Sequence, residues 1–459
     1  MDGISPESRV MFDYCHARLL RVRHHNSTLE AFYEAKYHVR DLGISTPPKM
    51  RHLRTVTGWP GAVVDCVDER LDFQGWLGRD DDLGRRLREL YQANCLDSES
   101  SRVHLDALIF GIGFAAVSRG GAGEPDSLVL GLSPKDTTGV WNPRTRRLDA
   151  ALTVTERGES GPVGWTFWDG AYRYRLVADG GGVVVADAAR HGFGRVPVVA
   201  FPNRARTSKP YGRSEITPAV VYYTEAAART LLGLEINREF YNTPQRVGLN
   251  MPDEAFQDAS GHPVNPWTAI LGRLWTLPPN PNPDAPNPEV HQFQPSSPAP
   301  YLDQIRGYQA MVAAEAGLPE GYLGLHTANP ASADAIRALE SRFVRRVQRR
   351  QVAFGRAWDE VAALALGLPA VADFGALWAP AATQTLAADA DAIAKLVGAG
   401  TFAPDSEVAL TWLRLSPEQQ ERIRAENVRH AQEAQANEFL SAVFANGDIP
   451  LAERRPVEG

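Results

Sequence analysis

The chain has 459 residues with 48 basic and 55 acidic side chains and a formal net charge of −7. No apolar run reaches the ~18–20 residues that a membrane span needs. The excess of acidic over basic side chains excludes a protein that binds nucleic acid through many phosphates, because such proteins are normally basic. The charged N-terminus lacks the apolar segment of a signal peptide, and three widely spaced cysteines, Cys15, Cys66 and Cys95, are typical of reduced thiols. We therefore expect a soluble protein of two or three domains.

The N-terminal part, up to about residue 120, is predicted to be mainly helical. At Gly111 the helical spacing gives way to alternating apolar residues, which indicates a helix that turns directly into a strand. The helices that the spacing predicts are Met11–Val22, Thr28–Lys36, Gly61–Leu77, Leu83–Asn94 and Ser101–Phe110.

From about residue 125 to 202 the apolar period becomes two, and turn sequences such as Asp169-Gly170 separate the runs. The pattern predicts an antiparallel meander, in which Trp141, Trp165 and Trp168 are packing residues. The apolar runs are Leu128–Leu132, Ala151–Val154, Trp165–Trp168, Tyr172–Leu176, Val183–Val185 and Val196–Phe201.

Two helices separated by an irregular stretch come next. They are predicted over Ile216–Tyr241 and Tyr301–Ala316, while Pro278–Pro300 contains nine prolines in 23 residues and can form neither a helix nor a central strand. The remaining expected elements are strands at Arg246–Asn250, Ala269–Leu277 and Val371–Trp378, and helices at Ala387–Gly398, Asp405–Leu413 and Pro417–Phe444.

The segment Gly317–Gly367 combines an aperiodic loop, Gly317–Ala331, with a helix of ~30 residues, or ~45 Å. Ser332 offers an N-cap and Asp334 an acid in the first turn. The apolar face that the spacing predicts comprises Ile336, Leu339, Phe343, Val347, Phe354 and Trp358. Arginines occupy the far side, namely Arg342, Arg345, Arg346, Arg349 and Arg356.

Motifs of catalysis are missing from the sequence. It contains no GxxxxGK[ST], HExxH or GxSxG motif. Asp80-Asp81-Asp82 and the pair His24-His25 are better explained as solvated surface than as metal ligands. We therefore expect no catalytic residues, no metal and no cofactor, and hence no enzyme.

Several stretches, taken in order over roughly two thirds of the chain, are characteristic of one protein family. They are Val63–Leu71 with Gly75, Ala107–Val117, Gly194–Asn203 followed by Gly212-Arg-Ser-Glu-Ile, Glu239-Phe-Tyr-x-x-Pro-Gln-Arg, Gly317-Leu-Pro with Tyr322-Leu-Gly, Asn329–Ala338, and Arg350-Gln-x-x-Phe-Gly-x-x-Trp. Together they resemble the portal (head–tail connector) proteins of tailed bacteriophages, of the siphovirus type.

The resemblance implies an α+β portal-type fold. It places a wing, with a helical start and an antiparallel β meander, at 1–211, and a first stem helix at 212–241. A small α/β clip at 242–299 and a second stem helix at 300–316 would follow. A tunnel loop at 317–331 and a long wing helix at 332–367 would come next. The chain would return to the wing at 368–400 and end in a short helical crown and tail at 401–459.

The resemblance also implies a homo-oligomeric ring of about twelve copies at one capsid vertex, around a channel for double-stranded DNA that is bound without sequence specificity. The implied partners are the terminase large subunit, a head-completion (adaptor) protein, and the major capsid and scaffolding proteins, with no membrane. The protein would nucleate capsid assembly in the host cytoplasm and remain at the portal vertex of the virion. Packaging energy would come from the separate terminase motor.

Three sets of residues are candidates for these roles. The tunnel loop would present Leu325, His326, Thr327, Ala328 and Asn329 to DNA. The clip would dock partners through Arg273, Trp275, Pro278 and Pro279. The arginine stripe Arg342–Arg356 is expected to bridge acidic patches of the neighbouring subunit, with contact to packaged DNA or plain solvation as alternatives.

A pore through which DNA slides should not offer a dense lattice of cations, and the acidic charge of each copy fits that requirement. Two other functions remain open from the sequence. One is an enzyme that processes DNA ends, such as a nuclease whose carboxylates meet only in the folded chain. The other is a minor head or scaffold protein that binds portal rings without forming one.

Overall fold

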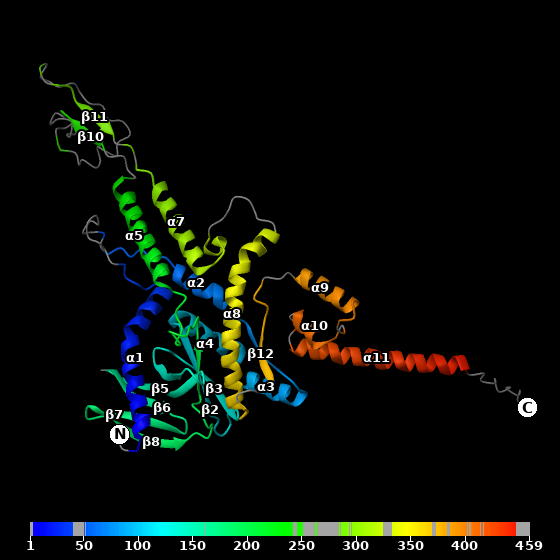
Figure 1. Ribbon diagram of the computed structural model, residues 1–459. Helices are drawn as coiled ribbons and strands as arrows, with labels where there is room; N and C mark the ends of the chain where they lie inside the picture. The colour runs from blue at the N-terminus through cyan, green and yellow to red at the C-terminus, as the bar shows by residue number, and fades with distance from the viewer. Residues whose placement is uncertain are drawn as a thin grey trace, which may run out of the picture. The chain divides into compact units, whose positions relative to one another are not determined.

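The computed structural model describes residues 3–39, 50, 52–159, 161–241, 246–250, 262–263, 284, 286–292, 294, 296–324, 333–369, 373–382, 386–401, 403, 405–413, 415 and 417–446. The chain falls into two compact units, Met1–Trp378 and Ala379–Gly459. Helices and antiparallel sheets alternate along it, which confirms the expected α+β class (Figure 1). Within the described residues, no helix is both long and apolar enough to cross a bilayer.

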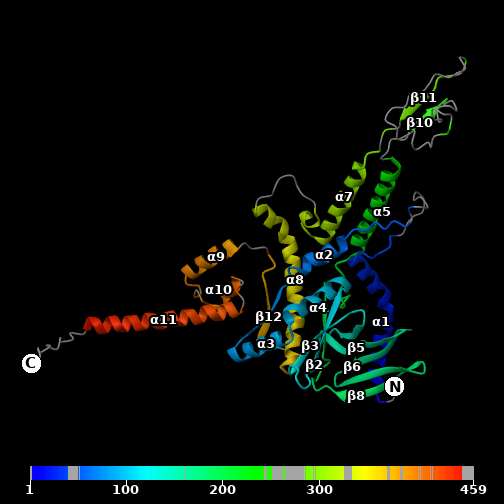
Figure 2. The ribbon, with the colours of Figure 1, turned by 180° about the vertical axis from the view of Figure 1, so that it is seen from behind.

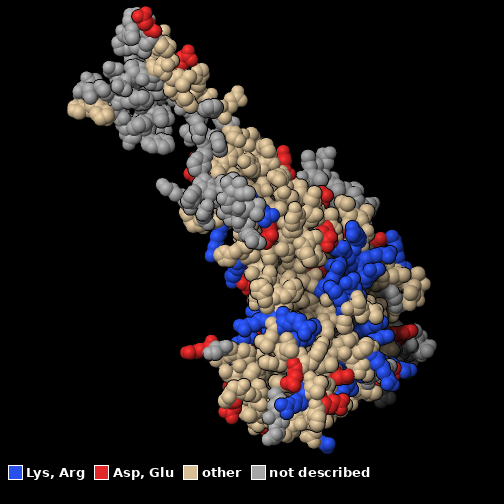
Figure 3. All heavy atoms as spheres, turned by 60° about the vertical axis from the view of Figure 1, so that its left-hand side comes forward, with Lys and Arg blue, Asp and Glu red and all other residues tan. Residues whose placement is uncertain are grey.

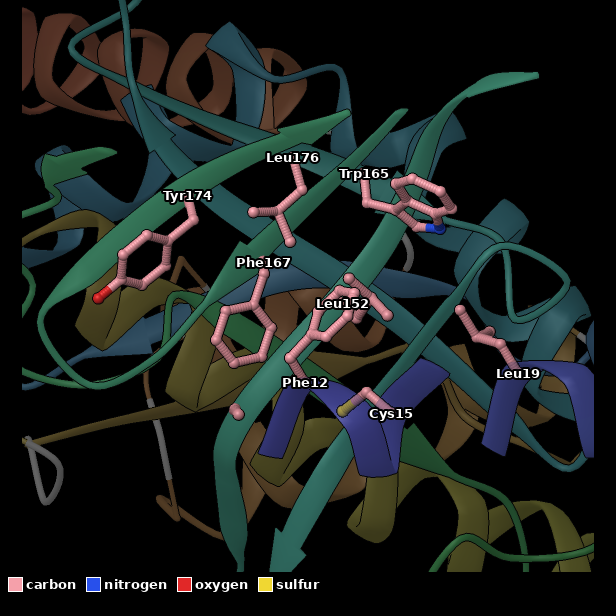
Figure 4. Close-up of a cluster of buried hydrophobic side chains, with 9 residues drawn as sticks. Phe12, Cys15, Leu19, Leu152, Trp165, Phe167, Tyr174 and Leu176 are labelled. Atoms are coloured by element: carbon pink, nitrogen blue, oxygen red, sulfur yellow. The ribbon is translucent and has the colours of Figure 1, made fainter. Parts of the chain in front are cut away.

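Helix α1 (Pro6–Tyr33) packs on a five-stranded antiparallel sheet in the order β4-β5-β6-β7-β8. Its strands are β4 (Thr137–Asn142), β5 (Arg147–Gly158), β6 (Gly161–Trp168), β7 (Tyr172–Asp179) and β8 (Gly182–Arg190). Phe12, Cys15 and Leu19 of α1 meet the buried side chains of β5, β6 and β7, among them Phe167 and Leu176 (Figure 4). The apolar face of the helix, with residues three or four apart, thus packs on one face of the sheet, to which every second strand residue points.

The prediction of two separate helices at the N-terminus was wrong, because α1 is continuous. The polar residues between the two expected helices do not interrupt it. Asn26 is buried there, and its amide donates to the Pro134 carbonyl over 3.0 Å. A tertiary hydrogen bond therefore satisfies a residue that would otherwise favour a break.

A second sheet has the order β3-β2-β9, with β2 (Ile112–Arg119), β3 (Ser127–Leu132) and β9 (Val198–Pro202). Helix α4 (Leu96–Phe110) runs into β2 through Gly111, whose φ of 91° ends the helix, so the predicted helix-to-strand turn is confirmed. The predicted antiparallel strands are present, but they divide between two sheets, and β4 was not foreseen.

The predicted helix Gly61–Leu77 is also corrected. Helix α2 covers Trp59–Asp68 only, and β1 (Phe73–Gly78) then pairs antiparallel with β12 (Phe374–Trp378). Phe73 and Trp76 are buried on β1, so tertiary pairing overrides the helical spacing. Helix α3 (Asp81–Ala93) follows, and Asp80 caps it by accepting from the Leu83 N–H over 2.8 Å. The acidic triplet Asp80-Asp81-Asp82 therefore forms the start of α3.

Helices α5 (Pro218–Tyr241) and α7 (Ala299–Ala316) lie side by side in both ribbon views, as Figures 1 and 2 show. Both were predicted from the sequence. Between them the described strands β10 (Arg246–Leu249) and β11 (Glu289–Gln292) form an antiparallel pair. β11 was not foreseen, and the expected strand Ala269–Leu277 lies outside the described residues.

A 3₁₀ turn, η3 (Glu320–Leu323), follows α7 within the expected loop, and helix α8 (Ala333–Ala365) comes next. Phe343, Val347, Phe354 and Trp358 are buried as predicted. Leu339 is 65% exposed, so its assignment to the apolar face was wrong. The buried stripe passes instead through Glu340, one residue along, which has partners described below. The side chains of Ile336 and of Ser332 and Asp334 lie outside the described residues.

The second unit contains α9 (Leu386–Gly398), α10 (Glu407–Trp412) and α11 (Pro417–Asn446), in agreement with the predicted helices. The described side chains of α11 are mostly exposed, and its sequence lacks a continuous apolar face. Such a helix obtains little stabilisation from its own unit.

Candidate functional site

The start of α5 is held by a close crossing of two backbone segments. The Asn203 N–H donates to the Gly111 carbonyl, and the Arg213 N–H donates to the Asn203 carbonyl, each over 2.8 Å. At Gly212, which has φ 72°, a Cβ atom would lie 2.3 Å from both the Asn203 and Gly111 carbonyl oxygens. Only glycine fits there, because both the backbone conformation and the available space exclude a side chain.

Glu215 follows this crossing and is 3% exposed. Arg350 of α8 donates to its Oε1 from both Nε, over 3.1 Å, and Nη2. Arg204 donates to Oε2 over 3.0 Å, and the Asn203 amide donates to Oε1 over 2.9 Å. A single carboxylate therefore joins β9, α5 and α8, and we call this set the Glu215 node.

The electrostatics of the Glu215 node favour the charged form. Burial alone would raise the pKa of Glu215, but the guanidinium groups of Arg350 and Arg204 outweigh burial and hold the pKa below its ordinary value. A buried carboxylate with two arginines and an amide has its hydrogen-bonding capacity largely met. Glu215 is therefore ionised at neutral pH and forms ion pairs with Arg350 and Arg204.

Arg346 makes the second joint, at the C-terminus of α7. Its guanidinium donates to the carbonyl of Glu315 over 3.3 Å and to the carbonyl of Ala316. Gly317 ends the helix with φ 67°, and a Cβ there would lie 2.6 Å from the guanidinium carbon of Arg346. A cation at the last carbonyls of a helix satisfies their lone pairs and complements the helix dipole.

η3 is attached to α8 by a third set of polar contacts. The Tyr322 hydroxyl donates to Glu340, and Arg70 donates to the Tyr322 oxygen over 2.8 Å. Burial, followed by the hydrogen bond to Glu340, raises the pKa of Tyr322 to about 12, so the phenol stays protonated. These contacts fix the turn η3, which lies in the first part of the expected tunnel loop.

A groove of about 880 Å³ opens between α8 and the segment after β9. We call it the arginine groove. Its lining comprises Pro202, Arg204, Ala205, Ser341, Arg342, Arg345, Arg346, Arg349, Arg350 and Ala353. None of these residues is acidic. Figure 3 shows that Lys and Arg side chains gather into dense patches on one face of the molecule.

Comparison with known proteins identifies the family of the chain. A family model described as "Phage portal protein, SPP1 Gp6-like" matches residues 13–433. The chain belongs to this family. It is 32% identical over 392 residues to the portal protein of Mycobacterium phage D29, covering 81% of this chain and 78% of that protein. It is 30% identical over 425 residues to the portal protein of Mycobacterium phage L5, covering 86% and 83%.

A solved structure titled "Neck of native GTA particle computed with C12 symmetry" aligns with 85% of this chain and 99% of its own, at 16% identity and a TM-score of 0.44.

The portal-family motifs of the sequence meet in the structure. Gly212-Arg-Ser-Glu-Ile supplies the carboxylate of the Glu215 node, and Arg350-Gln-x-x-Phe-Gly-x-x-Trp supplies its main arginine. The third motif, Tyr322-Leu-Gly, supplies the phenol bound to Glu340. Segments that are far apart in the sequence therefore connect the start of α5 and the turn η3 to α8.

Of the predicted stripe, Arg342, Arg345, Arg346 and Arg349 line the groove and Arg356 lies beyond it. The tunnel-loop candidates Leu325, His326, Thr327, Ala328 and Asn329 lie outside the described residues. The same holds for the clip candidates Arg273, Trp275, Pro278 and Pro279. In the part of the chain that the structure describes, no cluster of His, Cys, Asp or Glu could hold a metal ion.

Sequence reasoning missed Arg350 and Glu215. The signal for Arg350 was present, because Phe343, Val347, Arg350 and Phe354 follow one another at spacings of four, three and four residues. An arginine at a core position of a portal-family helix needs a buried anion. No local pattern identifies Glu215 as that anion.

Proposed function

We propose that this chain is the subunit of a portal ring at one capsid vertex. The ring would conduct double-stranded DNA during packaging and ejection, without reading its sequence. It would also dock the terminase large subunit and a head-completion protein, and nucleate the assembly of major capsid and scaffolding proteins. The observation that carries the proposal is the family match over residues 13–433.

Exposed apolar side chains on the stem pair support a ring of about twelve copies. Tyr222 on α5 is 60% exposed, and Met311 and Leu302 on α7 are 50% and 43% exposed. These exposed apolar side chains on two neighbouring helices are available for contact with another protein. A neighbouring copy would cover it in a ring.

The proposed regions follow the described elements. The wing would take α1 to β9, the stem α5 and α7, and the clip the segment that contains β10 and β11. α8 would be the long wing helix behind the tunnel loop, with β12 returning to the wing beside β1. Residues 379–400, which contain α9, would complete the return to the wing, and residues 401–459 would form the crown and tail.

The net charge of −7 per copy, multiplied around a ring, would create a field that keeps a DNA duplex from adhering to the channel wall. The working location would be the virion, after assembly in the host cytoplasm. We propose no catalytic step for this chain, and the energy for DNA movement would come from the terminase.

Negative-stain electron microscopy of the purified full-length chain tests the proposal. We expect ring-shaped particles with an axial opening and a mass of many subunits. A monomer or dimer under conditions that include capsid and scaffolding proteins would contradict it and favour a minor head protein. Mg²⁺-dependent cleavage of linear DNA by the purified ring would favour an enzyme of DNA ends.

A further inference from the structure

The arginine groove contains more positive charge than the residues described by the structure neutralise. Arg204, Arg346 and Arg350 are engaged by Glu215 or by the end of α7. Arg342, Arg345 and Arg349 are exposed, and no described residue accepts a hydrogen bond or an ion pair from them. Burial lowers the pKa of Arg346, and Arg204 and Arg342 lower it further, which reflects crowded cations. An outside anion would relieve this repulsion.

A surface of opposite charge lies around the end of α2, and we call it the acidic face. Its members are Asp65 and Glu69, which interact electrostatically with Asp68, and Asp72 and Asp97, which interact electrostatically with Tyr91. The last three are exposed, and no described Lys or Arg pairs with any of the four. Burial, together with the neighbouring carboxylates Asp65 and Glu69, raises the pKa of Asp68 to about 6 against a hydrogen bond from Ser101.

Arg70, the one basic residue between Glu69 and Asp72, points away from this face. It donates to Tyr322 and lies 3.8 Å from Glu340 of α8. The acidic face therefore lacks an internal counter-charge in its own part of the chain.

The two charged surfaces lie on opposite sides of α8. Glu340 and Gln351 face the end of α2, since both contact Arg70, Gln351 by donating to its carbonyl over 3.5 Å. At ~100° per residue, Arg349 lies about 180° around the helix from Glu340, and Arg345 about 140°. The groove arginines thus point away from the side on which α2 ends.

We propose that the arginine groove of one copy receives the acidic face of the next copy around the ring. A head-to-tail contact brings two different surfaces of the same chain together, so a ring needs complementary faces on opposite sides. Cations on one side of α8 and carboxylates on the other meet this condition. The inference rests on the proposed ring and adds which residues meet at each subunit boundary.

A charge swap tests the contact. R345E should raise the protein concentration at which half the chains are in rings by about tenfold, and E69R should do the same. The double variant R345E/E69R should return that concentration to within about threefold of the wild type, because the pair is restored with reversed sign. Mass photometry across a concentration series measures each value.

The matched control is R356E. Arg356 lies on the same side of α8 and is exposed, but it does not line the groove. The same charge reversal there should leave ring formation within about threefold of the wild type. Equal effects of R345E and R356E would contradict a role for the groove itself.

A cross-link tests the contact directly. In rings of R345K, a carbodiimide should join position 345 to Glu69, Asp72 or Asp97 of another copy, as mapped by mass spectrometry. Cross-links only to carboxylates outside the acidic face would overturn the proposal.

DNA is the competing occupant. If R345E leaves ring formation unchanged but weakens binding of a DNA duplex, measured by fluorescence anisotropy at low salt, the groove holds phosphates and the proposal is wrong. A wild-type chain that never forms rings contradicts the proposed portal function. If the wild type forms rings and both R345E and E69R form them equally well, the groove contact alone is contradicted.

Discussion

The two halves of α8 are attached to the rest of the first unit by different kinds of contact. In the C-terminal half, Phe354, Trp358 and Val361 are fully buried among apolar side chains. In the N-terminal half, Phe343 and Val347 are buried in the same way, but Arg346, together with Arg350 at the middle of the helix, adds charged contacts to the α7 end and the Glu215 node.

Apolar packing supplies most of the free energy of folding but tolerates small shifts. Charged hydrogen bonds have fixed geometry, so they orient segments that bury little area. Apolar packing therefore anchors α8, and the charged contacts of Arg346 and Arg350 orient the end of α7 and the start of α5. The predictions below test that division.

The largest loss of stability should follow removal of the central aromatic residue in the C-terminal half. Trp358 stacks on Phe73 with ring centroids 5.0 Å apart, and its Nε1–H donates to His104 over 2.8 Å. Trp358→Ala should lower the free energy of unfolding by ~3–5 kcal/mol, measured by urea denaturation. Val352→Ala, at a position 60% exposed on the same helix, should cost less than about 0.5 kcal/mol.

Among the charged contacts of α8, loss of the Glu215 carboxylate through Glu215→Gln should be the most damaging change. It leaves Arg350 and Arg204 without their buried anion, which should cost about 3 kcal/mol in the same denaturation experiment. Glu215→Gln combined with Arg350→Met should be less destabilised than Glu215→Gln alone, because the stranded cation is then removed. A double variant that loses the sum of both single losses would argue against an ionic joint.

The cap of α7 should contribute a smaller amount. Gly317→Ala places a Cβ against the Arg346 guanidinium and in a left-handed conformation, and it should cost ~1–2 kcal/mol. Gly307 provides the matched control, since it lies within α7 and a Cβ there meets nothing within 4 Å. Gly307→Ala should raise stability by up to ~1 kcal/mol. Differential scanning calorimetry of both variants measures the contrast.

The smallest expected effect depends on pH and distinguishes two carboxyl groups, that of Asp359 on α8 and that of Glu215, which contacts α8 through Arg350. Burial raises the pKa of Asp359 from 3.8 to about 6, against a hydrogen bond from Ala376. Its charged form therefore destabilises the fold, with a penalty that grows from pH 3.8 to about 6 and is constant above. Asp359→Asn should be more stable than the wild type at pH 7.5, and this gain should disappear at pH 4, as urea midpoints would report.

Glu215 should behave in the opposite way. Its pKa is lowered from 4.5, so its stabilising contribution is present above pH 4.5 and is lost as the pH falls through the folded-state value. A gain in Asp359→Asn that is equal at both pH values would contradict the assignment of buried charge in the C-terminal half.

The long elements of the fold could be predicted from the sequence. α8 has a clear helical period, and Gly111 marks the turn from α4 to β2. Where prediction failed, tertiary contacts decided the outcome. The segment Phe73–Gly78 has helical spacing but forms strand β1, because β12, about three hundred residues later, pairs with it.

Of the candidate site, the arginine stripe was predicted as a surface, but its division into roles was not. Arg342, Arg345 and Arg349 remain exposed, while Arg346 caps α7. Arginines at neighbouring positions have different partners, because successive side chains point in different directions around α8 and so face different segments. No property of the arginines themselves distinguishes them.

The amino-acid sequence alone determined the helices and strands of strong period, the absence of familiar catalytic motifs, and the family. These depend on residues that are neighbours along the chain. Only the tertiary structure decided that Glu215 meets Arg350, 135 residues away, and that one side of α8 is basic while the other faces the acidic end of α2. An ion pair depends on distance in space, which local periodicity does not encode.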